Sequence, residues 1–144
     1  MTAQIISGRD IAHQLLEDEL VPRVQVLNKK GLQPKLVVIL VGDHAASASY
    51  VRQKEKFADK AGILAETWRY EDSVTEDKIL AEIEQINTDA SIHGVIVQLP
   101  LPKHISVEKV LNAIDPAKDV DGFTPVNIGK LFLGEPCLQC CTPK

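Results

Sequence analysis

The stretch KLVVILVG, residues 35–42, decides the fold class of this 144-residue chain. It is a short apolar run, rich in β-branched residues and closed by a glycine, which is typical of a strand buried on both faces. Two more apolar runs follow at residues 63–70 and 93–99, and segments of helical periodicity separate the three runs. Strands that alternate with helices predict an α/β fold in three layers, with a mainly parallel sheet and helices on both of its faces.

The longest expected helix spans residues 45–61 and ends before Gly62, because glycine is the commonest residue just after a helix. Ser73 followed by Glu76 matches the capping-box pattern, so we expect a second helix to begin there. Its apolar periodicity continues to about residue 87.

Three further elements are expected towards the ends of the chain. Residues 10–30 form a helix that Pro22 should kink, because proline cannot donate the backbone hydrogen bond that a helix needs. Residues 106–114 form a short helix, and residues 128–133 are a candidate fourth strand. In such sheets ligands bind at the carboxyl ends of the strands, so the residues after each strand are examined first.

Composition and charge narrow the function classes. The chain has 44% hydrophobic and 25% charged residues, which is ordinary for one globular domain. Its net charge of −4 argues against a general binder of nucleic acids or anionic membranes. No apolar run approaches the roughly 20 residues that cross a bilayer, and no signal peptide is readable. We therefore expect a cytoplasmic protein.

The three cysteines, Cys137, Cys140 and Cys141, lie together near the end of the sequence. Cys137 and Cys140 form one C-x-x-C pair, but zinc needs about four ligands and no second pair or histidine motif supplies them. We expect no metal site and interpret the thiols as incidental.

The helix expected over residues 45–61 carries a lysine on its apolar side. At about 100° per residue, one arc collects apolar and small residues, with Lys54 among them. The other members of this arc are Ser47, Tyr50, Val51, Phe57, Ala58 and Ala61. Either the stem of Lys54 packs while its ammonium reaches water, or the amine lies in a shielded pocket and exchanges protons there. The pattern leaves both interpretations open.

Four more residues are candidates for a site, each with an ordinary alternative. Tyr50, one turn before Lys54, is either an aromatic wall beside it or a core residue. Gln98 ends the third strand, where its amide can bond the lysine or a substrate, or cap strand-end amides. Asp121 precedes a glycine, so it marks a turn or a fixed carboxylate for a heterocycle. Ser47 can help to hold an anion at the helix start or simply cap the helix.

A set of short motifs follows one order along nearly the whole chain. They are VGD (41–43), AS (46–47), YV (50–51), KEK (54–56), GVIVQLPLP (94–102), KDVDGF (118–123) and CTP (141–143). This ordered set resembles the family of bifunctional methylenetetrahydrofolate dehydrogenases/cyclohydrolases. The resemblance implies that Lys54 assists proton movement in the cyclohydrolase step and that Gln98 positions it. It also implies that Tyr50 stacks on the aromatic part of the folate and that Asp121 grips the pterin ring. The remaining substrate-binding residues that we expect are Ser47 and Pro100.

The resemblance further implies a reaction sequence. Methylenetetrahydrofolate is oxidised to methenyltetrahydrofolate with NADP and is then hydrolysed to 10-formyltetrahydrofolate. The implied role is one-carbon metabolism that serves purine, methionine and histidine biosynthesis. The implied partners are tetrahydrofolate derivatives and a second copy of the longer protein, with no nucleic acid and no membrane.

The dinucleotide-binding part of the family has no counterpart in this sequence. Its eight glycines form no G-x-G pair, so the chain lacks the usual means of cradling a pyrophosphate. We expect residues 1–144 to be the folate-binding catalytic domain, followed in the family by a Rossmann domain for NADP. On its own the chain should not act as a dehydrogenase.

Two other function classes remain open. One is a non-catalytic folate-binding or dimerisation module, which would not need the Lys54 amine. The other is a receiver-like regulatory domain, which needs clustered acidic residues at strand ends to hold magnesium, whereas Asp43 stands alone there. A geometric difficulty also remains, because Lys54 lies two to three turns into its helix, roughly 10–15 Å from the expected edge of the sheet.

Overall fold

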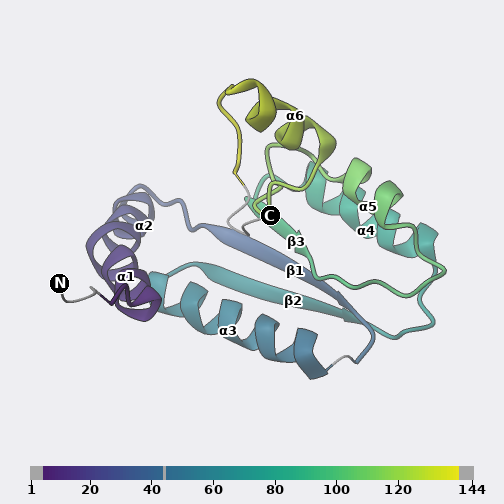
Figure 1. The fold of residues 1–144 in the computed structure, drawn as a ribbon, viewed down its shortest axis with the longest axis horizontal. Helices are drawn as coiled ribbons and strands as arrows, with labels where there is room; N and C mark the ends of the chain where they lie inside the picture. The colour runs from purple at the N-terminus through teal and green to yellow at the C-terminus, as the bar shows by residue number, and fades with distance from the viewer. Residues whose placement is uncertain (1–4, 44, 140–144) are drawn as a thin grey trace.

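A computed structural model describes residues 5–43 and 45–139 of the chain (Figure 1). In chain order the elements are α1 (Gly8–Gln14), the π-helical η1 (Leu15–Leu20), α2 (Val21–Lys29), β1 (Lys35–Val41), α3 (Ala45–Ala61), β2 (Leu64–Tyr70), α4 (Glu76–Thr88), β3 (Gly94–Val97), α5 (Val107–Ala113) and α6 (Pro125–Leu133). None of these helices is both long and apolar enough to cross a bilayer. Cys140, Cys141 and the CTP motif lie outside the described residues, and Cys137 is a partly buried free thiol.

The sheet has three parallel strands in the order β2-β1-β3, so the first strand of the sequence lies in the middle. Figure 1 shows α3 along one face of this sheet and α4 with α5 on the opposite face. The expected α/β fold with helices on both faces is confirmed. The 45–61 helix has the expected bounds, and Gly62 after it has a φ of 78°.

Side chains of β1 alternate between two cores, because successive residues of a strand point to opposite faces. One core joins β1 to α4 and α5, and its buried members are Val37, Ile39, Val41, Ile79, Ile83, Ile86, Ile92, Val95, Val97, Ile105, Val110 and Ile114. The other lies under α3 and contains Val38, Leu40, Val51 and Ile96. Burial on both faces explains why residues 36–41 are all apolar, without the alternation of a half-exposed strand.

The N-terminal helical segment is distorted just before Pro22, as expected. Val21 donates its backbone N–H to the carbonyl of Leu16, five residues back, so the helix widens into a π turn between α1 and α2. This wider turn accommodates Pro22, which has no backbone N–H to donate to the preceding turn of the helix.

The predicted cap of α4 is wrong by two residues. Thr75, not Ser73, is the N-cap, and its Oγ1 accepts a hydrogen bond from the Lys78 N–H at 3.3 Å. Glu76 does not complete a capping box, because its carboxylate accepts bonds from the Ser106 N–H at 2.7 Å and from Lys109 Nζ at 2.6 Å. The carboxylate thus ties α4 to α5.

Thr75→Ala should lower the free energy of unfolding by about 1 kcal/mol, because it leaves an N-terminal amide of α4 without its acceptor. Urea unfolding monitored by the fluorescence of Trp68 measures the change. Ser73→Ala is the matched control and should leave the midpoint unchanged. A larger loss from Ser73→Ala than from Thr75→Ala would contradict the assignment of the cap.

The expected strand at residues 128–133 is wrong, because these residues belong to α6. Thr124 caps this helix by accepting the Asn127 N–H at 3.3 Å, and Pro125 occupies its first turn. Gly134 ends it with a left-handed φ of 73°. The third strand is also shorter than expected, since pairing with β1 ends at Val97.

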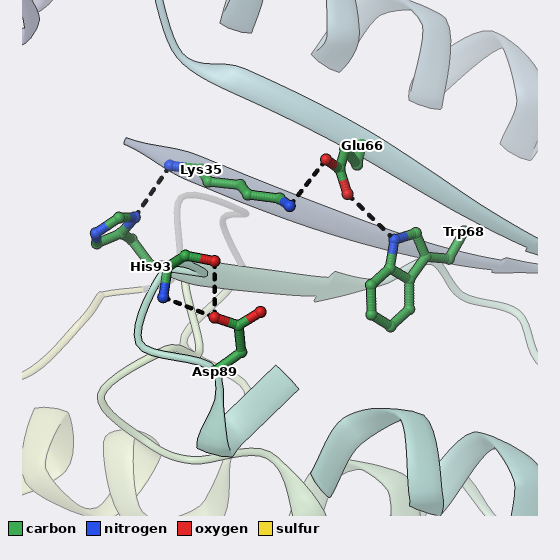
Figure 2. Close-up of polar contacts among 6 residues, drawn as sticks. Lys35, Glu66, Trp68, Asp89 and His93 are labelled. Atoms are coloured by element: carbon green, nitrogen blue, oxygen red, sulfur yellow. Dashed lines mark hydrogen bonds and ion pairs between the residues drawn. The ribbon is translucent and has the colours of Figure 1, made fainter. Parts of the chain in front are cut away.

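Polar contacts hold the amino-terminal ends of the strands together (Figure 2). The Lys35 N–H donates to His93 Nδ1 at 3.1 Å, and Lys35 Nζ forms an ion pair with Glu66 at 2.8 Å. The hydrogen bond with Lys35 lowers the pKa of the Glu66 carboxyl below its ordinary value, and Trp68 also donates to this group. These contacts are at the end of the sheet opposite to the edge where ligands are expected, so we interpret them as structural.

Candidate functional site

Lys54 lies on the sheet-facing side of α3. It belongs to the same helical row as Ser47, Val51, Ala58 and Ala61, all of which are buried, whereas Lys54 itself is partly buried. Two other residues expected on this arc are exposed at its border: Tyr50 is 63% exposed and Phe57 is 43% exposed.

The amine of Lys54 is held by Gln98. Lys54 Nζ donates to Gln98 Oε1 at 3.3 Å, and Gln98 Nε2 donates to the carbonyl of Leu99 at 2.8 Å. The second bond fixes the orientation of the amide, so that its oxygen is the atom facing the lysine. The amine therefore takes part in a polar contact at the end of β3.

The shortness of β3 removes the expected geometric difficulty. Its last pair is Val97 with Ile39, and the Gln98 N–H still donates to the Ile39 carbonyl at 2.9 Å. Since β1 continues to Val41, the end of β3 is recessed by roughly 7 Å from the end of β1. Gln98 thus lies deep enough along the sheet to meet a residue in the middle of α3.

A second contact fixes the rotation of α3 on the sheet. Thr67 Oγ1 of β2 donates a hydrogen bond to the carboxylate of Glu55, the residue after Lys54. The two contacts, one to β2 and one beyond the end of β3, lie on either side of β1. Together they prevent α3 from turning about its axis, which keeps Lys54 aimed at Gln98.

Lys54 lies between a small polar pocket and an apolar groove. The pocket has a volume of about 150 Å³ and is lined by Lys54, Val97, Gln98, Leu99, Asp121 and Phe123. The groove, about 470 Å³, lies between the N-terminal helices and α3, and Leu15, Leu16 and Phe57 are among its apolar residues. The stem of Lys54 thus packs on apolar surface while its amine bonds Gln98.

Asp121 is the carboxylate of this pocket. Burial raises the pKa of its carboxyl above the ordinary value, the positive charge of Lys54 opposes this rise, and the negative charge of Asp119 adds to it. A partly desolvated carboxylate beside a lysine and an amide can accept hydrogen bonds from the ring N–H and amino groups of a heterocycle.

The structure brings together three of the six predicted site residues. Lys54, Gln98 and Asp121 line one pocket, although they come from α3, the end of β3 and the segment before α6. Tyr50 lies one turn from Lys54 but points to the surface, Pro100 is exposed and Ser47 is buried. These three do not line the pocket.

Sequence reasoning missed several residues that build the pocket. Val97, Leu99 and Phe123 form its apolar walls. Asp119 was noticed only as part of the KDVDGF motif, although it is 2% exposed and therefore an unusual buried carboxylate. The available signal was the KDVDGF motif itself, in which Asp119 comes two residues before the Asp121-Gly122 turn and Phe123 comes directly after it.

Comparison with known proteins adds an independent line of evidence. Residues 6–121 match the family described as "Tetrahydrofolate dehydrogenase/cyclohydrolase, catalytic domain". The chain is 50% identical over 139 residues to the bifunctional protein FolD of Enterococcus faecalis, covering 96% of this chain and 49% of that protein. The chain therefore spans about half the length of the curated relatives it matches.

Solved structures agree with this match. FolD methylenetetrahydrofolate dehydrogenase/cyclohydrolase from Campylobacter jejuni superposes with a TM-score of 0.90 at 40% identity, over 93% of this chain and 48% of that one. The Trypanosoma brucei enzyme, solved with NADP cofactor and an inhibitor, gives a TM-score of 0.85 at 36% identity, over 91% and 45% of the two chains. On its sequence match and its fold, this chain belongs to the tetrahydrofolate dehydrogenase/cyclohydrolase catalytic-domain family.

Proposed function

We propose that this chain binds tetrahydrofolate derivatives and forms the folate-binding catalytic domain of a methylenetetrahydrofolate dehydrogenase/cyclohydrolase. The observation that carries the proposal is the contact of Lys54 with Gln98 in one pocket with Asp121, in a chain of this family. An amine, an amide and a carboxylate that converge in a partly shielded pocket suit both recognition of a pterin and movement of a proton.

Each residue has a proposed role that follows from its position. Asp121 accepts hydrogen bonds from the pterin ring in the pocket that it lines together with Lys54 and Gln98. Tyr50, exposed one turn before Lys54, is available to stack on the aminobenzoyl ring of the folate. The further proposed substrate contacts are Ser47 and Pro100.

The hydrolytic step needs little from the protein beyond proton handling. Water adds to the cationic methenyl carbon, which forms a C–O bond. One C–N bond of the five-membered ring then breaks, to give 10-formyltetrahydrofolate and release one proton. Lys54 Nζ is proposed to move the proton between water and the ring nitrogen, while Gln98 holds the amine in place.

The residues of this chain do not fit NADP. The turn after β1 contains a single glycine, Gly42. A Cβ built on this glycine would lie 2.8 Å from a carboxylate oxygen of Asp72. A carboxylate behind the turn repels a pyrophosphate, and the sequence has no G-x-G pair. NADP, which the Trypanosoma brucei relative binds, is therefore proposed to depend on residues outside these 144. Oxidation of methylenetetrahydrofolate, in which hydride passes to NADP, would then require both the folate pocket of this chain and those further residues.

The wider biological role is proposed from the family. We propose a cytoplasmic homodimer that supplies one-carbon units for purine, methionine and histidine biosynthesis, without nucleic-acid or membrane partners. The net charge of −4 supports the last two points.

Titration calorimetry with 5-formyltetrahydrofolate tests folate binding by this chain. Tyr50→Ala should weaken binding by about 0.5–1.5 kcal/mol, because it removes an aromatic contact. Phe57→Ala, two turns further along α3 and outside the pocket, is the matched aromatic control and should bind like the wild type. A folded wild-type chain that binds no folate would overturn the proposal.

A further inference from the structure

Residues 118–124 carry Asp121 into the pocket, and each side of this segment is anchored separately. On the first side, Lys118 Nζ donates to the carbonyls of Ile86 and Asp89, at 2.6 and 2.7 Å, near the end of α4. The Lys118 carbonyl accepts the Val95 N–H at 2.8 Å, so the segment runs parallel to the start of β3. These contacts place the segment but do not determine how it turns after residue 119.

Asp119 supplies the anchor on the second side. Its Oδ1 accepts the Phe123 N–H at 3.2 Å, and its Oδ2 accepts the Thr124 N–H at 2.8 Å and Asn127 Nδ2 at 3.0 Å. Its backbone carbonyl also accepts the Gly122 N–H at 3.1 Å. All four donors come after Asp121 in the sequence, so Asp119 closes a turn in which Asp121 is enclosed.

The charge of Asp119 is stabilised by dipoles. Among the described residues no cation forms an ion pair with it. Burial alone would raise the pKa of its carboxyl, yet the bonds from Asn127, Thr124 and Phe123 lower this pKa below the ordinary value. The donors lie at the N-terminus of α6, where a negative charge is favourable.

We propose that Asp119 is a positioning residue, whose buried carboxylate holds residues 119–124 in the turn that presents Asp121 to Lys54. The inference rests on the proposed function, since it gives Asp121 the part of the pterin-binding carboxylate. Thr124 belongs to the same arrangement, because it both donates its N–H to Asp119 and caps α6 with its side chain.

Asp119 also acts on Asp121 electrostatically. Two charged groups face Asp121, namely Lys54 from α3, which favours its ionised form, and Asp119 from its own segment, which disfavours that form. The third polar neighbour in the pocket, Gln98, is neutral. Removing the charge of Asp119 and opening the turn to water both lower the pKa of Asp121, so the two effects have the same sign.

The variant Asp119→Asn tests the proposal in two measurements. The asparagine side chain has one NH₂ group in place of a carboxylate oxygen, and this group cannot accept the N–H bonds that the oxygen accepted. We therefore expect the turn to open. In the ligand-free chain, the carboxyl ¹³C resonance of Asp121 should titrate at lower pH than in the wild type. The affinity for 5-formyltetrahydrofolate should fall at least about tenfold while the circular dichroism of the sheet and helices is retained.

Asn127→Ala is the second variant, because it removes one donor and leaves the charge of Asp119 in place. We expect it to weaken folate binding by about threefold and to leave the Asp121 titration close to that of the wild type. A folded Asp119→Asn variant with wild-type affinity and a wild-type Asp121 titration would overturn the proposal. If Asp119→Asn does not fold, wild-type affinity in Asn127→Ala would overturn it.

The two measurements also separate this inference from the proposed function. A wild-type chain that does not bind folate refutes the function, whereas the Asp121 titration needs no ligand and still tests Asp119.

Discussion

Lys54→Met is expected to slow the hydrolysis of 5,10-methenyltetrahydrofolate by about 10²–10⁴-fold, the usual contribution of a positioned general acid or base. Methionine is a flexible apolar residue of similar length, so it can fill the place of the stem in the lining of the apolar groove. What it removes is the amine that bonds Gln98. The variant should therefore have a lower rate of hydrolysis and a fold like that of the wild type.

A single-turnover assay with the chain in excess over substrate measures this rate from the loss of the methenyl absorbance. Lys56→Met, an exposed lysine on the same helix, is the control and should keep the wild-type rate. A rate for Lys54→Met equal to that of the wild type would favour the non-catalytic folate-binding module. If the wild type is no faster than the uncatalysed reaction, the chain is not a cyclohydrolase by itself.

Asp121→Asn is expected to weaken folate binding by about 1.5–3 kcal/mol, because a charged acceptor for the pterin is lost. The same variant should be more stable than the wild type at neutral pH. The sign follows from the raised pKa of Asp121: burial makes its ionised form unfavourable in the folded chain. The native state then holds its proton at pH values where the unfolded chain has released it, so stability is lost as pH rises.

Thermal unfolding as a function of pH checks this sign. The two proteins should differ little in stability well below the ordinary carboxyl range. The advantage of the variant should grow as pH rises from that range to the raised pKa of Asp121, and remain constant above it. Asp59→Asn, which alters an exposed carboxylate of α3, should change neither affinity nor stability. A variant that is less stable than the wild type at neutral pH would contradict the burial of this charge.

The local sequence pattern was sufficient to predict the elements whose structure is determined mainly by burial of apolar side chains. The apolar run at 36–41 is rich in β-branched residues, which favoured a strand covered on both faces, and α3 has an apolar row and a following glycine that define its bounds. The position of Lys54 within that apolar row could be predicted from a rotation of about 100° per residue. Its partner Gln98 was a candidate because it ends the expected third strand, and in the structure its side-chain oxygen accepts a hydrogen bond from Lys54 Nζ.

Prediction failed where tertiary contacts decide between local alternatives. Residues 128–133 are a short and mostly apolar run, so their periodicity does not separate a strand from a helix, and in the structure they belong to the helix that Thr124 caps. Glu76 could have completed a capping box with Ser73, but Ser106 and Lys109 from α5 occupy its carboxylate. Neither partner is near it in the sequence.

The depth of the pocket was also beyond the sequence. It depends on how many residues of β3 pair with β1, and pairing stops two residues before β1 ends, at Ile39 rather than Val41. Asp119 was missed for a related reason. Its segment is typical of a turn, and the donors that stabilise its buried charge are two backbone amides and the side-chain amide of Asn127, whose positions only the fold determines.

The central claim is that the pocket of Lys54, Gln98 and Asp121 is the folate site. The most direct test is a ¹⁵N and ¹³C chemical-shift titration of this chain with 5-formyltetrahydrofolate. We predict the largest shifts at the side-chain amide of Gln98, the backbone of Leu99, Asp121 and Phe123, and the side chain of Lys54. A folded chain that shows no shifts, or shifts confined to residues of α4 and α5 such as Leu80, Glu84, Lys109 and Asn112, would contradict the account.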